Sequence, residues 1–256
     1  MQPTTTGQNR TGAATAEEGV RAMLQANERW APTEAIDTTL ADADRSFYVT
    51  ESDSVGSIPP PVTIHGMLKS GFDKLLGERP EVLMDKIGER LAFERTGTRL
   101  YDALIVKYET LVAGGDMPDL PTPPDMGDAD VASTLERIRS EEHEHFLMLS
   151  EVMTSLGGDP TAQTPCADVT GVASMGLMQV VTDPRTTFAQ ALNAMLIAEL
   201  TDNAGWELLI TLAEEAGETD IAEQFQRAKA EEEEHLVIVN SWFTALVTAP
   251  FATVAA

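Results

Sequence analysis

The chain has 256 residues, enough for one large domain or two small ones, and its 43% hydrophobic content can supply a sizeable buried core. The formal net charge of −25 argues against nucleic acid as a partner, because phosphates are bound by Lys and Arg, and it favours attraction of cations. The single cysteine, Cys166, excludes an intramolecular disulfide framework and a four-cysteine metal site.

Residues 1–79 are expected to form an N-terminal extension. Residues 1 to about 15 are rich in Thr, Gly and Ala without periodicity, which is typical of disorder. Residues 16–30 favour a short helix, whereas three consecutive prolines at 59–61 exclude one there. Thr63 can cap another short helix, in which His65 has no acidic partner at a metal-binding spacing and is interpreted as structural.

The sequence indicates neither a membrane-spanning segment nor a signal peptide. No apolar run approaches the 18 residues that a membrane span needs. The first 18 residues lack the apolar stretch of a signal peptide. We therefore expect a cytoplasmic protein without a membrane partner.

Four long helical patterns follow the extension and predict an all-α fold, a four-helix bundle over residues 80–247 with a tail at 248–256. A Pro-rich loop at 114–130 separates the first two patterns. A long crossover at 161–183, with a short helix at 172–181, separates the second from the third. The predicted helices cover residues 80–113, 130–156, 185–216 and 220–247.

Each predicted helix carries one carboxylate in the middle of its otherwise apolar stripe. These residues are Glu94, Glu142, Glu199 and Glu232. An unpaired buried carboxylate costs several kcal/mol or takes up a proton, and four together would repel one another. Two divalent cations would balance the four negative charges, so the pattern predicts a dinuclear metal site.

Two of the four carboxylates belong to a repeated motif, Glu142-x-x-His145 and Glu232-x-x-His235. This spacing puts both side chains on one helix face, where they can bind one metal ion. The surrounding acids allow a plainer interpretation as solvated helix faces; they are Glu141, Glu144, Glu231, Glu233 and Glu234. Apolar residues flanking each motif at helical spacing favour the buried metal site. His143 should face solvent, and Trp206 and Trp242 should belong to the core.

The set Glu94, Glu142-x-x-His145, Glu199 and Glu232-x-x-His235 resembles the ferritin–bacterioferritin–rubrerythrin superfamily, whose helix bundles hold such a site. The resemblance covers about residues 80–247. It implies a ferritin-like four-helix bundle with two iron ions, or manganese or a mixed pair. Tyr101 stands where ferritins carry a tyrosine beside the metals. Asp202 stands where rubrerythrins carry an additional glutamate ligand, and is a candidate seventh ligand.

Three functions remain open from the sequence. The resemblance implies an oxidoreductase in which two iron ions react with dioxygen or peroxide, with an electron donor that the sequence does not identify. A ferroxidase that stores iron in an oligomeric shell is the second, although the long 114–130 loop and the extension could obstruct such a shell. The third is a structural or interaction bundle with a bound metal pair. We expect a homo-oligomer, at least a dimer.

Overall fold

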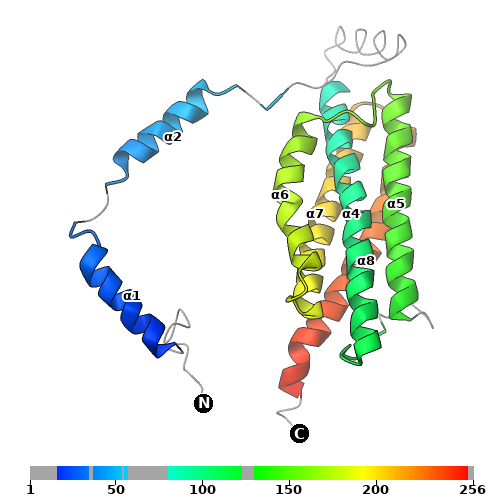
Figure 1. The fold of residues 1–256 in the computed structure, drawn as a ribbon. Coiled ribbons are helices and arrows are strands. Elements are labelled where there is room, and N and C mark those ends of the chain that lie inside the picture. The colour runs from blue at the N-terminus through cyan, green and yellow to red at the C-terminus, as the bar shows by residue number, and fades with distance from the viewer. Residues whose placement is uncertain (1–15, 35–36, 54, 57–79, 123–129, 253–256) are drawn as a thin grey trace. The chain divides into compact units, whose positions relative to one another are not determined.

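The computed structural model describes residues 16–34, 37–53, 55–56, 80–122 and 130–252. Its regular elements are all helices, with no strand in the described ranges, which confirms the all-α fold (Figure 1). None of these helices is both long and apolar enough to cross a membrane. The helix predicted from Thr63, together with His65, lies outside the described residues.

The chain divides into two compact units, residues 1–54 and 55–256. The first contains α1 (Glu17–Trp30), which begins and ends close to the predicted positions, and α2 (Thr39–Glu51). Neither helix has a buried residue. α2 was not predicted from the sequence, although Asp37 precedes it and its carboxylate accepts hydrogen bonds from the Thr39 N–H (2.9 Å) and hydroxyl (2.6 Å).

The second unit is a helix bundle of α4 (Pro80–Gly114), α5 (Val131–Ser155), α7 (Phe188–Glu215) and α8 (Thr219–Ala252). The crossover between α5 and α7 contains α6 (Pro165–Thr182), which packs against α4 and α7 (Figure 1). α6 is longer than the predicted short helix. It starts earlier because Thr164 caps it by accepting a hydrogen bond from Ala167 N (3.3 Å), and Pro165 suits a first helical position.

Local signals set the ends of the bundle helices. Asp130 caps α5 by accepting a hydrogen bond from Ser133 N (2.7 Å). A capping box of Thr187 and Gln190 starts α7 a few residues later than predicted. Glycines in the left-handed region follow the ends of α4, α5 and α7, at Gly115, Gly157 and Gly217. α8 continues past the predicted end at residue 247.

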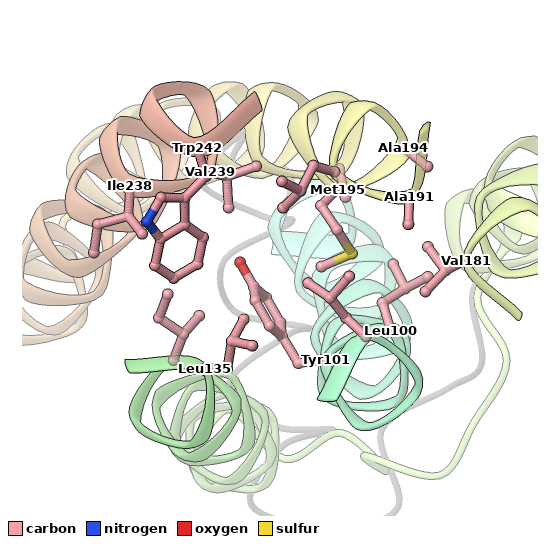
Figure 2. Close-up of a cluster of buried hydrophobic side chains, with 14 of the residues drawn as sticks. Leu100, Tyr101, Leu135, Val181, Ala191, Ala194, Met195, Ile238, Val239 and Trp242 are labelled. Carbon is pink, nitrogen blue, oxygen red and sulfur yellow. The ribbon is translucent and has the colours of Figure 1, made fainter. Parts of the chain in front are cut away.

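Two hydrophobic clusters fill the bundle, one toward each end. The first contains Tyr101 from α4, Leu135 from α5, Met195 from α7 and Trp242 from α8, and Figure 2 shows these side chains converging. The second is built around Trp206 and Phe225, together with Leu83, Ile87, Leu91, Leu149 and Val152. As predicted, both tryptophans are fully buried. Val112, near the end of α4, is 49% exposed.

Candidate metal centre

The predicted ligands meet between the two hydrophobic clusters. All six are buried, at most 4% exposed: Glu94, Glu142, His145, Glu199, Glu232 and His235. They come from the middles of four helices, where each replaces an apolar residue on the inward stripe. Their side-chain ligand atoms gather in groups whose members lie within 4.8 Å of one another, close enough to hold a metal ion.

All three of these groups contain one carboxylate, that of Glu232, and two of them also contain an imidazole. Glu94, His145 and Glu232 form one group, and Glu142, Glu199, Glu232 and His235 form the other. Glu232 lies between the two imidazoles, with Oε1 2.7 Å from His145 Nδ1 and Oε2 3.2 Å from His235 Nδ1. The two rings are 6.3 Å apart between centroids. Because one of its oxygens faces each imidazole, Glu232 could contribute to the binding of an ion in either group.

The outer nitrogens of both imidazoles meet carboxylates from the opposite helix. His145 Nε2 lies 2.7 Å from Glu231 Oε2, and His235 Nε2 lies 2.8 Å from Glu141 Oε2. A proton on Nε2 would be donated to the glutamate, which leaves the Nδ1 lone pair facing the cluster and available to a metal ion. Arg137 in turn pairs with Glu141 (2.8 Å) and reaches Glu234 on α8 (2.6 Å).

The buried polar atoms at the centre fit a bound cation. Several have no hydrogen-bond partner, and those in the cluster include both carboxylate oxygens of Glu94, Glu142 Oε2 and Glu199 Oε2. Buried acceptors without donors are costly, whereas divalent cations would satisfy them directly. Four glutamates also match the charge of two divalent ions, so the residues present fit the metal pair that the sequence resemblance implies.

Without a cation, the cluster holds protons at neutral pH. Burial and the charge of Glu232 raise the pKa of Glu94 to about 7 and that of Glu199 to about 8. The same causes raise the pKa of Glu142 well above its usual value. Burial alone would lower the pKa of His145, but the hydrogen bond with Glu232 and the charge of Glu94 raise it to about 9. Metal binding must therefore displace protons.

Tyr101 and Gly97 place two of the carboxylates. The Tyr101 hydroxyl donates a hydrogen bond to Glu199 Oε1 (2.5 Å), so α4 orients a side chain of α7. Burial and the charge of Glu199 raise the pKa of Tyr101 well above its usual value, which keeps the hydroxyl protonated. At Gly97 an added Cβ would collide with Glu142 Oε2, so only glycine leaves room for that carboxylate.

Asp202 is buried beside the cluster, where it forms an ion pair with Arg90. The Arg90 guanidinium also donates to the Asp202 carbonyl (3.1 Å) and lies over the Phe93 ring at 4.2 Å. Gly205 makes this possible, because a Cβ there would stand 2.7 Å from the guanidinium carbon. Asp202 also belongs to a third ligand group, with Glu94, Glu142 and Glu232. It remains a candidate seventh ligand whose charge Arg90 balances.

Three further participants were missed by the sequence analysis: Glu141, Glu231 and Arg90. The two glutamates were assigned to the plainer, solvated interpretation, although each directly precedes a motif glutamate and repeats the pattern Glu-Glu-x-x-His. Arg90 lies four residues before Glu94 on the same face of α4. His143 is exposed, as the helical spacing predicted.

Comparison with known proteins gives one family. Residues 125–247, which span α5, α6, α7 and most of α8, match the family model described as a ferritin-like domain. The match supports membership of the ferritin-like superfamily, the class that the all-α fold and the ligand motifs indicate. A search of curated proteins and a search of solved structures both found no match to the chain.

Proposed function

We propose that this chain is a ferritin-like oxidoreductase whose resident cofactor is a pair of iron ions and whose oxidant is dioxygen or peroxide. The observation that carries the proposal is the pair of ligand groups that share Glu232. Two neighbouring groups with a common carboxylate are suited to two ions, whereas a structural site needs only one. Carboxylates with two imidazoles suit iron or manganese better than softer metals.

The residues divide into two half-sites. Glu94, His145 and Glu232 would hold one ion, and Glu142, Glu199, His235 and the shared Glu232 would hold the other. When bound, an iron pair supplies two electrons, one from each Fe(II), so that one peroxide and two protons become two waters.

The protein's own groups would hold the ligands in place and move protons. Glu141 and Glu231 fix the orientation and tautomer of the imidazoles. Tyr101 orients Glu199 through its hydroxyl. The Glu231 side chain is 50% exposed, so its contact with His145 links the buried centre to solvent and offers a route for displaced protons. The hydrophobic clusters on both sides exclude bulk water.

The test is oxidant consumption by the anaerobically loaded chain. With two Fe(II) per chain, we expect about one peroxide consumed for each iron pair oxidised, from the two-electron balance. Glu199→Gln should slow the oxidation at least ~10-fold, because it removes a ligand charge and alters the Tyr101 contact. Glu207→Gln is the matched control, since Glu207 is an exposed glutamate on the same helix. Equal rates in both variants would contradict the proposal.

The same experiment separates the other two functions. Storage predicts that iron continues to accumulate well beyond two per chain as the oxidant is renewed, with iron as substrate. A structural bundle predicts that metal is bound but that neither oxidant is consumed faster than by free Fe(II). The acidic surface, with a net charge of −25, would attract iron in either case and does not discriminate between them.

A further inference from the structure

We infer that the outer face formed by α6, the first half of α7 and the second half of α8 binds a second copy of this chain. The inference is independent of the metal site. It starts from the uneven distribution of charged residues along the sequence. Charged residues make up 23% of the whole chain. Yet residues 169–182, 186–206 and 236–252 contain only two, Glu199 and Asp202, and both are buried.

The three uncharged segments form one continuous face. α7 packs against α6 on one side and α8 on the other. Where the end of α6, the start of α7 and the end of α8 meet, they line a common groove with Val180, Ala189, Asn193, Phe243 and Val247. The exposed apolar side chains of this neutral face are Val169, Val172, Met175, Val180, Ile197, Leu200, Val237 and Val247.

The lack of charge on the neutral face and the shape of its surface favour a second copy as the occupant. Interface cores are depleted of charged residues, and a face without charge offers nothing to select an acidic or basic partner. Two copies that each carry −25 repel one another wherever their charged surfaces meet, so the neutral face is where they can approach. The face also carries the exposed Val172 side chain on α6 and a groove at Phe243, and two-fold symmetry would let such a side chain of one copy meet the groove of the other.

The face is large enough for a dimer. An 18-residue helix such as α6 is ~27 Å long. Three helices at 8–10 Å spacing span roughly 20 Å between the outer axes. The footprint is therefore on the order of 500 Å² per copy before side-chain relief is added, or roughly 1,000 Å² for two copies, which is the lower bound for a specific interface.

The experiment is sedimentation of the full chain with two matched variants. We expect the unmodified chain to sediment at about twice its 27.6 kDa mass. Ile197→Glu should raise the dissociation constant at least ~100-fold, because two-fold symmetry would bury two like charges. Leu147→Glu is the control: Leu147 is 46% exposed and Ile197 is 48% exposed, but Leu147 lies on the charged outer face of α5.

Val172→Glu, at a side chain that is 70% exposed on α6, repeats the test if Ile197→Glu does not fold. If the unmodified chain is monomeric at about 100 µM, a concentration well above the Kd of a specific dimer, the inference is overturned. The occupant of the face would then be another protein, a membrane or another segment of the chain. Dimers that survive both α6 and α7 substitutions would overturn it too. Metal content, measured on the same samples, should stay unchanged, so failure here leaves the proposed function standing.

Discussion

Gly97 shows how one missing side chain places a ligand. It lies on α4 against the carboxylate of Glu142, and an added Cβ would occupy the position of Oε2. The atom that would have to move is the end of a flexible side chain, so the bundle can survive the substitution while the carboxylate cannot stay in place. The residue thus serves the metal centre rather than the turn or bend that glycine often supports.

Gly97→Ala should therefore weaken metal binding while the apo-protein keeps its fold. We expect at least ~10-fold loss of affinity, as for other changes that reposition a ligand. Alanine also favours the helix by up to about 1 kcal/mol, which offsets some of the crowding. Titration with Co(II), followed by absorbance, measures the affinity. Gly171→Ala on α6 is the control, because its Cβ would meet nothing within 4 Å. The Co(II) affinity of that variant should therefore stay unchanged.

The six candidate ligands could be selected from sequence because each is recognised locally, as an acid on an apolar stripe or as a Glu-x-x-His pair, and the structure brings them together. Glu141 and Glu231 could not be assigned in the same way. On their own helices they point away from the motif face, and their imidazole partners come from the opposite helix. That contact depends on the rotation and register of α5 against α8, which a single helix pattern does not contain. The role of Gly97 could not be predicted either, because it depends on how α4 packs against Glu142 of α5.

At the scale of elements, Asn203 joins the two ligand helices α7 and α8. Its side-chain amide donates to the Glu199 carbonyl (3.0 Å) on its own helix and to the Glu232 carbonyl (3.0 Å) on α8. Both acceptors are backbone atoms of ligand residues. The bond therefore sets the register of α7 against α8 at the level of the metal centre.

Asn203→Ala should destabilise the protein by about 1–3 kcal/mol, because two hydrogen bonds are lost and the Glu232 carbonyl loses a partner. Urea unfolding of the apo-protein measures this free energy. Asn27→Ala, at an exposed asparagine on α1, should change it by less than ~0.5 kcal/mol. Equal free energies for the two variants would show that Asn203 does not couple the helices.

Helix positions followed from sequence where caps and periodicity agree, as in α4, α5, α7 and α8. α2 was not predicted because its 13 residues have no buried face, so no apolar stripe indicates a helix there. The start of α6 was not predicted because Gly171 and several valines lower the helix propensity of the segment. The cap that starts the helix, Thr164, lies before them. At α6 the capping pattern of Thr164 and Pro165 outweighed the composition of the segment.

For the whole molecule, the buried acids make apo-protein stability depend on pH. The pKa of Glu94 is raised from 4.5 to about 7 and that of Glu199 from 4.5 to about 8, so above pH 4.5 the folded state holds more protons than the unfolded state. The pKa of His145 is raised from 6.5 to about 9, which acts in the same direction. The stability that these raised pKa values contribute is lost as pH rises from the unfolded values towards the folded ones. The pKa of Glu232, which the neighbouring His235 and His145 lower to about 2 against the effect of burial, acts in the opposite direction only below about pH 4.5.

The melting temperature of the apo-protein should therefore fall between pH 6 and pH 9. The free energy of unfolding should fall by about 1.4 kcal/mol per pH unit for each additional proton held by the folded state. Scanning calorimetry of the metal-free chain measures the trend. The metal-loaded chain should show the reverse, because binding displaces the same protons and strengthens as pH rises. A melting temperature that rises with pH in the apo-protein would contradict the charge arrangement of the cluster.

The most direct test of the dinuclear centre is the number of metal ions that the chain binds without oxygen. Anaerobic titration with Fe(II), with the bound metal counted by mass spectrometry, should saturate at about two ions per chain, from the four-glutamate charge balance. Glu232→Gln should reduce this to one or fewer, because both ligand groups share Glu232, whereas Glu233→Gln at the adjacent exposed position should keep two. Saturation at one ion, or equal binding by the two variants, would contradict a shared-carboxylate dinuclear centre.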